Sequence, residues 1–413
     1  MEDAVIVSIT RTAVGKSRKG ALADTRAEDL GRTVLEEAVR RAPGLAKVDV
    51  DDVIVGCAMP EGEQGLNFAR TMALYAGFPV TVPAITVNRF CASGLQAIAF
   101  AAERIALGRA EAIVAGGVES MSHVPMAGFK LAPHPQLVET MPELYMGMGH
   151  TAEAVARRFG ITREDQDAFA LASHRKADAA LRAGRFRDEI VPVAALRRGV
   201  DPSGRPFAQP LLFDTDEGVR PDTSLAGLAK LKPAFSLGGT VTAGNASQMS
   251  DGAAAAVVLS RRKAEALGLR PLAALRAFAL AGVEPELMGV GPVQAIPRAL
   301  RCAGLTREQV DLYEINEAFA AQCMHVIREL ELDEARVNVN GGAIALGHPL
   351  GCTGAKLTAS LIYELRRRGG GIGVVSMCVG GGMGAAGVFE VYPAEGEARP
   401  NLLKTPEIEE GDA

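Results

Sequence analysis

The stretch VPAITVNRFCASGLQAIAFAAERI, residues 82–105, passes from a strand pattern to a helix pattern at a single cysteine, Cys91. Its first six residues are uncharged and partly β-branched, which favours an extended strand. After the cysteine, apolar residues recur at helical spacing, at Leu95, Ile98, Ala99, Ala102 and Ile105. A strand that leads directly into a helix is typical of α/β proteins.

The position of Cys91 at the start of this helix indicates a reactive thiol. Free backbone amides and the positive end of the helix dipole would face the sulfur. We expect this environment to lower the thiol pKa and to favour the thiolate, which attacks carbonyl groups. A buried structural cysteine is the alternative, because free cysteine is among the most buried residue types.

Apolar strands alternate with amphipathic helices over most of the chain, which predicts an α/β protein. Strands are expected at residues 5–9, 52–55 and 112–115, the last ending at a pair of glycines. A helix capped by Asp24 or Thr25 follows the first strand, with Leu30, Val34, Leu35 and Val39 on one face.

Residues 121–244 differ from the rest, with many prolines, glycines and methionines and few strand signals. One long helix is expected there, capped at Thr162 with Asp165 three residues later. We interpret this segment as an inserted loop domain. The α/β pattern then returns at residues 245–259 and again from residue 272.

This organisation predicts two core halves and a tail. Residues 1–120 with 245–268 form the first half, residues 269–393 form the second, and the acidic residues 394–413 form a loose tail. A strand–turn–helix–strand order around Cys91 recurs around His348. Two halves built on one plan would place these turns face to face across a pseudo-twofold axis.

Composition excludes several classes of protein. The 413 residues are 48% hydrophobic and 23% charged, with a formal net charge of -5, whereas a nucleic-acid reader usually carries a basic stripe. Six cysteines without CxxC pairs, and a start that lacks a signal peptide, predict reduced thiols in a cytoplasmic protein. Residues 369–389 are uncharged, but nine of these 21 are glycine, so we expect a buried strand and loop and no membrane span.

Two more segments carry groups suited to chemistry. In GGAIALGHPLG, residues 341–351, His348 is fixed on a constrained turn before a helix, where its ring could take a proton from a thiol. In MCVGGGMG, residues 377–384, Cys378 ends a strand and opens a turn whose amides could bind an oxyanion. A structural histidine and a buried cysteine are the alternatives.

Other motifs add less. Residues 382–387 match GxGxxG, but the following residues have a strand pattern, so dinucleotide binding is not expected. Asn316 follows a strand at residues 310–313 and could hold a water or orient a histidine. The remaining histidines lack the spacing of metal ligands, so no metal site is expected.

Together these segments resemble the thiolase family over about residues 4–393. The matching blocks occur in the family's order: NRFCASG at 88–94, GGVESMS at 116–122, KLKPAF at 230–235, TAGNASQMSDGAA at 242–254, NEAFA at 316–320, GGAIALGHPLGCTG at 341–354 and CVGGGMG at 378–384. The resemblance implies a thiolase-like fold layered α-β-α-β-α, with two pseudo-repeated core domains and an inserted loop domain. Thiolases make or break a carbon–carbon bond between acyl groups carried on coenzyme A.

The resemblance also implies a role for each matched residue. Cys91 would be the nucleophile that holds the acyl group, and His348 would take its proton. Cys378 would move the proton at the α-carbon. Asn316 would hold a water that forms one oxyanion hole with His348, and the amides of Cys91 and Gly380 would form the other.

Coenzyme A would be a substrate bound by the loop domain rather than a tightly held cofactor. Arg220 and Ser247 would contact it, and Met148, Phe235 and Phe319 would line the pantetheine and acyl channel. Core packing, or a solvated surface charge for Arg220, is the alternative for these residues. The resemblance further implies a homodimer or a tetramer built as a dimer of dimers.

One departure bears on the substrate. Family members dedicated to acetoacetyl-CoA often have a histidine before the methionine that matches Met148, and here Gly147 stands there. The chain thus looks closer to the broad-chain 3-ketoacyl-CoA thiolases of fatty-acid breakdown. The other cysteines, Cys57, Cys302, Cys323 and Cys352, are interpreted as structural.

Three rival functions remain. A decarboxylating ketoacyl synthase would not need Cys378, and neither would a cysteine hydrolase, which would release a free acid. A catalytically inactive lipid- or CoA-binding protein on the same fold would not need Cys91, His348, Cys378 and Asn316 together.

Overall fold

Nine strands form one continuous path through the computed structural model, which describes residues 2–200 and 203–394. Their order is β11-β12-β13-β10-β1-β9-β5-β3-β4, and β2 (Gly15–Lys16) and β6 (Ile190–Val191) pair beside the path. The nine strands are β1 (Ala4–Thr12), β3 (Asp52–Gly56), β4 (Ala84–Val87), β5 (Ala112–Ser120), β9 (Ser250–Ser260), β10 (Ala273–Gly282), β11 (Leu312–Ile315), β12 (Gly371–Val379) and β13 (Met383–Val391).

The sheet consists of two similar halves that meet where β1 pairs with β10. In the first half, β4, β3 and β5 run parallel, and β9 and β1 continue antiparallel. In the second half, β11 and β12 run parallel, and β13 and β10 continue antiparallel. The repeated order supports the expected internal echo, although Val337 forms only an isolated bridge with Tyr313 where a lead strand was expected.

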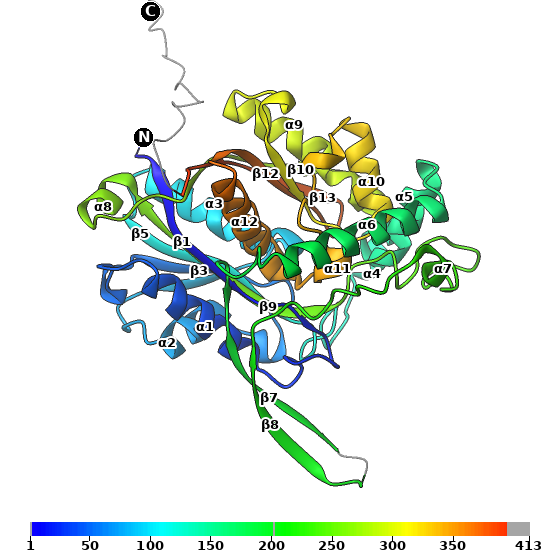
Figure 1. Cartoon of the computed structure of the whole chain (residues 1–413), viewed down its shortest axis with the longest axis horizontal. Coiled ribbons are helices and arrows are strands. Elements are labelled where there is room, and N and C mark those ends of the chain that lie inside the picture. The colour runs from blue at the N-terminus through cyan, green and yellow to red at the C-terminus, as the bar shows by residue number, and fades with distance from the viewer. Residues whose placement is uncertain (1, 201–202, 395–413) are drawn as a thin grey trace, which may run out of the picture.

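Helices complete five layers (Figure 1). The central layer is α3 (Ser93–Ala106) and α12 (Leu350–Arg367), which pack on each other between the two halves. The outer layers are α1 (Ala27–Arg40) and α2 (Phe68–Tyr75) on one side and α9 (Gly291–Ala303) and α10 (Ala320–Glu329) on the other. The predicted α-β-α-β-α class is therefore confirmed.

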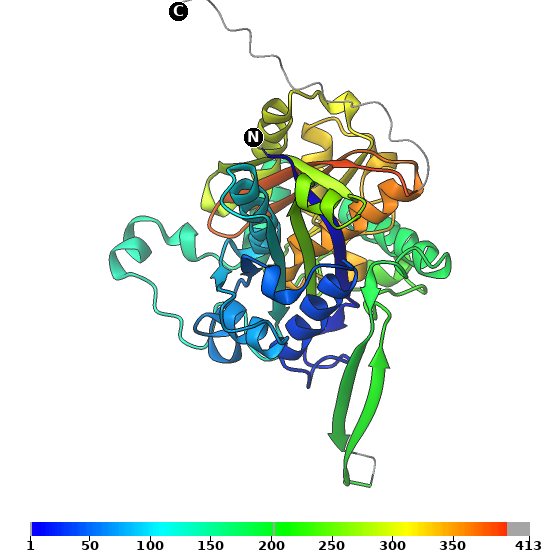
Figure 2. The ribbon, with the colours of Figure 1, turned by 90° about the vertical axis from the view of Figure 1, so that its left-hand side faces the viewer.

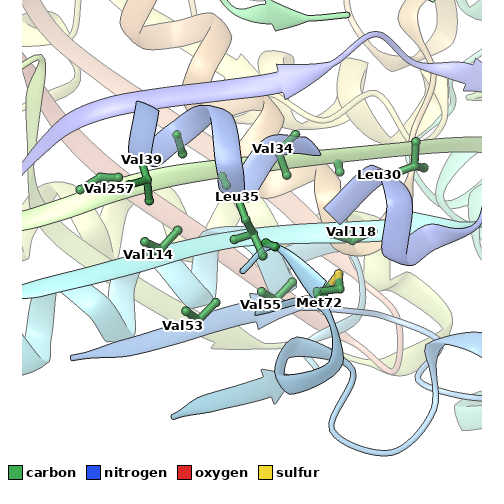
Figure 3. Packing of buried hydrophobic residues seen from close by; sticks show 14 of the residues in the cluster. Leu30, Val34, Leu35, Val39, Val53, Val55, Met72, Val114, Val118 and Val257 are labelled. Atoms are coloured by element: carbon green, nitrogen blue, oxygen red, sulfur yellow. The ribbon is translucent and has the colours of Figure 1, made fainter. Parts of the chain in front are cut away.

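The outer face of the first half shows why the spacing in α1 decides its packing (Figure 3). The predicted stripe is buried against valines of the sheet, among them Val53, Val55, Val114 and Val257. Each such side chain contributes about 1.5–3 kcal/mol when fully buried. The predicted cap is wrong, because Arg26 occupies the N-cap and offers no side-chain bond. Acidic Glu28 and Asp29 in the first turn compensate the helix dipole instead.

The inserted segment contains more structure than its composition predicts. The long helix α6 (Arg163–Arg182) has the expected capping box, with Thr162 Oγ1 accepting from the Asp165 amide at 3.1 Å. The helices α4 (Pro135–Thr140), α5 (Met148–Arg158), α7 (Leu225–Leu228) and α8 (Arg261–Ala266, in the core after β9) were not expected. Nor was the hairpin of β7 (Val193–Val200) and β8 (Pro206–Phe213), which projects from the body (Figures 1 and 2).

Glycines in the sheet permit close approach rather than ending strands. β5 continues past Gly116 and Gly117, contrary to prediction. Glycine is needed at both positions, because a Cβ on Gly116 would lie 2.1 Å from Ala254 O and a Cβ on Gly117 would lie 2.0 Å from Gly351 O. Within residues 245–259, where the α/β pattern was expected to return, the strand β9 begins at Ser250.

The C-terminal glycine-rich region forms β12 and β13, so the GxGxxG match lies at the start of a strand, as predicted. In the described part of the chain, no helix has the length and apolarity needed to cross a bilayer. The predicted tail lies outside the described residues, apart from residue 394.

Candidate active site

Cys91 lies in η3 (Phe90–Ala92), a single turn that precedes α3. Phe90 adopts a φ of +43°, which is uncommon for a bulky residue and marks local strain. The turn is held from both sides: the Phe90 amide donates to Asn88 Oδ1 at 2.8 Å, and Ser93 Oγ donates to the Phe90 carbonyl at 2.7 Å. The strand β4 and the helix α3 thus fix the direction of the Cys91 side chain.

The backbone amides of Cys91 itself and of Gly380 act to lower the pKa of the Cys91 thiol. Even so, burial raises the pKa of the Cys91 thiol to about 12, and the nearby Glu119 carboxylate adds to the increase. The expected lower pKa is therefore wrong, because the loss of hydration outweighs both amides and the helix end. Cys91 is a neutral thiol at rest.

His348 is fixed at both its backbone and its ring. Gly347, at a φ of +93°, precedes it, and the His348 amide donates to Gln248 O and Ser250 Oγ, each at 3.2 Å. In the ring, Nδ1 lies 2.6 Å from Thr353 Oγ1 and Nε2 lies 3.3 Å from Asn316 Nδ2. Burial lowers the pKa of His348 to about 3, with a further decrease from the Lys356 ammonium.

Asn316 lies directly after β11, and its backbone amide donates at 2.9 Å to the carbonyl of Ser376, which lies two residues before Cys378. Its side chain is fully buried, and Oδ1 has no partner. A buried carbonyl oxygen without a donor is uncommon and calls for a ligand or a water.

Cys378 is buried near the end of β12 and packs with Met148, Phe319, Ala318 and Met288, among others. Burial raises the pKa of the Cys378 thiol well above its usual range, and the nearby Cys91 adds to the increase. The two thiols therefore lie in one dry region. Gly380 completes it, since a Cβ there would contact Met148 Sδ at 3.5 Å.

His348 and the thiols are connected through neighbouring residues that pack together. Leu350, two residues beyond His348, packs in one cluster with Ala58, Met121 and Cys91. The predicted residues Cys91, Cys378 and Gly380 thus gather at one place, and Asn316 and His348 form a pair attached to it.

Four of the five predicted coenzyme contacts border this region. The rings of Phe235 and Phe319 make an edge contact with centroids 6.1 Å apart, and Met148 packs beside Phe319. The Ser247 amide donates to Ala318 O at 2.9 Å. Arg220 is exposed, and its backbone amide donates to His174 Nδ1. In the same segment, the Gly218 carbonyl accepts from Gln248 Nε2 at 3.0 Å.

Sequence reasoning gave no role to two buried residues at the site. Glu119 accepts from the amides of Ala58 and Gly351, each at 2.8 Å, and from Gln64 Nε2. Thr353 contacts the His348 ring. A carboxylate inside an apolar strand was the available signal for Glu119, whereas nothing in the sequence distinguishes Thr353 from other helical threonines.

A thiol, an imidazole and exposed backbone amides in one region are groups that could carry out acyl transfer. Among the described residues, no group of three or more side chains is placed to hold a metal ion.

Comparison with known proteins gives the family. The model described as "Thiolase, N-terminal domain" matches residues 4–262, and "Thiolase, C-terminal domain" matches residues 269–391. The chain therefore belongs to the thiolase family, and as a thiolase it is an acyltransferase.

Individual relatives agree with this assignment. A protein named 3-ketoacyl-CoA thiolase from Bacillus subtilis (strain 168) is 59% identical over 391 residues, 95% of this chain and 100% of the relative. A protein named acetyl-CoA acetyltransferase from Pseudomonas aeruginosa is 49% identical over 399 residues, 94% and 98% of the two chains. The crystal structure of the Bacillus anthracis acetyl-CoA acetyltransferase superposes with a TM-score of 0.86 at 44% identity, covering 95% and 99%.

Proposed function

We propose that the protein catalyses the reversible thiolytic cleavage and Claisen condensation of 3-ketoacyl-CoA by a ping-pong mechanism through an acyl-Cys91 intermediate. The observation that carries this proposal is the closeness of two thiols, the half-buried Cys91 and the buried Cys378, with the Gly380 amide near the Cys91 sulfur. A second buried thiol suits a reaction that moves a proton at carbon.

In the first half of the synthetic direction, the Cys91 proton passes to His348 Nε2 as the sulfur attacks the thioester carbon. The carbon–sulfur bond to coenzyme A then breaks, and the departing thiolate takes the proton of Cys378. Acyl-Cys91, a protonated His348 and a Cys378 thiolate remain. The two charges arise together in a dry pocket, so neither is left uncompensated.

In the second half, the Cys378 thiolate removes an α-proton from acetyl-CoA, and the resulting carbanion attacks the acyl carbon on Cys91. The new carbon–carbon bond forms as the bond to the Cys91 sulfur breaks, and His348 returns its proton to that sulfur. Thiolysis runs the same steps in reverse. Every proton is restored at the end of the cycle.

Two oxyanions form at different steps, so two sets of donors are needed. The amides of Cys91 and Gly380 lie near enough to the Cys91 sulfur to lower its pKa, which supports their role around the acyl oxygen. The unpartnered Asn316 Oδ1 supports the other set of donors. A water held there would donate one proton to Oδ1 and the other, beside His348, to the second thioester oxygen.

The acyl and pantetheine channel is proposed to run past Met148, Phe235, Phe319 and Ser247, which border the thiols. Arg220, exposed and further along the same surface, would contact the distal part of coenzyme A. Gly147 in place of a histidine favours 3-ketoacyl chains longer than acetoacetyl. The domain boundaries, a cytoplasmic location, a role in fatty-acid metabolism and a homodimeric or tetrameric assembly remain predictions.

A product assay tests this function. The purified full-length protein is incubated with acetoacetyl-CoA and free coenzyme A, and we expect two acetyl-CoA for each substrate consumed. Release of free acid would indicate a hydrolase, and condensation that requires loss of CO₂ would indicate a ketoacyl synthase; either result contradicts the proposal. Rates on longer 3-ketoacyl-CoA substrates then give the chain-length preference.

A further inference from the structure

The ring of His348 is part of a chain of polar contacts whose direction can be worked out from the donors available. Thr353 Oγ1 lies 3.0 Å from the Pro349 carbonyl, one helical turn back, and 2.6 Å from His348 Nδ1. A hydroxyl has one proton, and the Pro349 carbonyl, which also accepts from the Cys352 amide at 2.9 Å and the Thr353 amide at 3.0 Å, can only accept. When Thr353 Oγ1 donates its proton to that carbonyl, it accepts from Nδ1–H.

The other ring nitrogen gives the same direction. With Asn316 Nδ2 facing the ring, 3.3 Å from Nε2, the amide donates and Nε2 presents its lone pair. The surroundings of this ring favour the neutral form: His348 is buried, and the buried Lys356 lies on α12, the helix that carries Thr353. A neutral ring with an acceptor at Nε2 carries its one proton on Nδ1.

We propose that Thr353 is a positioning residue that fixes the Nδ1–H tautomer of His348 and so directs the Nε2 lone pair toward the Cys91 thiol. The inference rests on the role of His348 proposed above. Without the Thr353 acceptor, Nδ1–H would be buried without a partner. The ring would then favour Nε2–H, and a rotated Asn316 amide could accept that proton through Oδ1.

The same helix supplies a matched control. Thr358 is also buried, and its Oγ1 donates to the Gly354 carbonyl one turn back at 2.8 Å, as Thr353 does to Pro349. Thr353→Val and Thr358→Val therefore remove the same kind of helix bond, and only the first removes a contact to His348. Thr353→Ser keeps the hydroxyl.

The experiment combines a spectroscopic and a kinetic readout on the full-length protein. Solid-state NMR with ¹⁵N-labelled histidine reports the protonated nitrogen of each of the six histidines, and His348→Asn assigns the signal. Rapid-mixing measurements with acetyl-CoA give the rate of Cys91 acylation, since a misplaced base costs about 10²-fold or more.

We expect Nδ1–H in the parent, in Thr353→Ser and in Thr358→Val, with acylation rates within about threefold of each other. Thr353→Val should shift the proton to Nε2 and slow acylation by about 10²-fold. A parent spectrum with Nε2–H, or a Thr353→Val protein that acylates as fast as Thr358→Val, overturns the proposal. If Thr353→Val does not fold, the parent spectrum decides. Absence of acylation in the parent would refute the proposed function, while the tautomer would still test the role of Thr353.

Discussion

Cys91 and His348 form a neutral pair before substrate binds, because burial acts on both groups in the same sense. It raises the pKa of the Cys91 thiol to about 12 and lowers that of His348 to about 3. A preformed thiolate–imidazolium pair would need the opposite order of pKa values. In the proposed mechanism, proton transfer therefore accompanies attack on the thioester.

These two pKa values predict how the reaction of Cys91 with iodoacetamide changes with pH. Only the thiolate reacts, and a pKa raised to about 12 makes its fraction grow about tenfold per pH unit through pH 7–9. We expect the alkylation rate of the Cys91 peptide, followed by mass spectrometry, to rise over this range without a plateau. The exposed Cys302 serves as an internal reference in the same sample. A plateau reached below pH 7 would instead indicate an ion pair.

At the level of elements, the turn after β12 combines glycines with different tasks. Gly380 supplies an amide, and a Cβ on it would meet Met148 Sδ and Phe90 only at ordinary contact distances of 3.5 Å or more. Gly382 has a φ of +86°, and a Cβ there would lie 2.3 Å from the Val283 carbonyl. Gly381, at a φ of +79°, and Gly382 are required by the backbone conformation, whereas Gly380 is not.

Alanine at each position separates these tasks. Gly380→Ala should leave the unfolding free energy nearly unchanged and retain acylation by acetyl-CoA, because the amide remains. Gly382→Ala should lower the unfolding free energy by roughly 2–5 kcal/mol through the positive φ and the backbone clash. Denaturant titration of both proteins measures the difference; equal stability would show that the turn does not hold this conformation.

Elements were predictable from sequence where a local signal agreed with the packing. In the apolar stripe of α1 and the capping box of α6, the residue types themselves indicate which side chains are buried and where the helix begins. The hairpin β7–β8 lacked such a signal, since most of its residues are exposed and show no alternation. The cap of α1 was predicted wrongly because Asp24 and Thr25 precede the helix by more than one residue.

On the scale of the whole molecule, α3 and α12 bring the two halves of the site together. They cross closely at glycines: a Cβ on Gly94 would lie 2.8 Å from the Gly351 carbonyl, and one on Gly354 would lie 2.3 Å from the Leu95 amide. Cys91 lies in the single turn directly before α3, and α12 follows His348. The distance between the helices therefore sets the distance between Cys91 and His348.

Gly354→Ala should separate these helices. The methyl group would collide with the backbone of α3, and we expect a loss of roughly 3 kcal/mol or more in unfolding free energy together with a large loss of acylation rate. Gly282→Ala is the control, because no atom lies within 4 Å of its Cβ and its φ is ordinary. Thermal unfolding and acylation assays of both variants test this. A fully active and stable Gly354→Ala protein would contradict the close crossing.

The candidate site was only partly predictable at this scale. Motifs identified Cys91, His348, Cys378 and Asn316, because each lies at a strand end or glycine turn that sequence can indicate. The sign of the Cys91 pKa shift was not predictable, because it depends on burial by residues far apart in the chain. The contact of Thr353 with the imidazole was missed for the same reason, since it requires the exact path of the turn between them.

The most direct test of the central proposal, two thiols acting on one substrate, is deuterium uptake at the α-carbon of acetyl-CoA by Cys378→Ala in D₂O. The account predicts that Cys378→Ala still gains an acetyl group on Cys91, whereas Cys91→Ala does not. It also predicts that the exchange rate of Cys378→Ala falls by about 10²-fold or more. Exchange at the parent rate would contradict the account, because the proton at carbon would then be moved by another group.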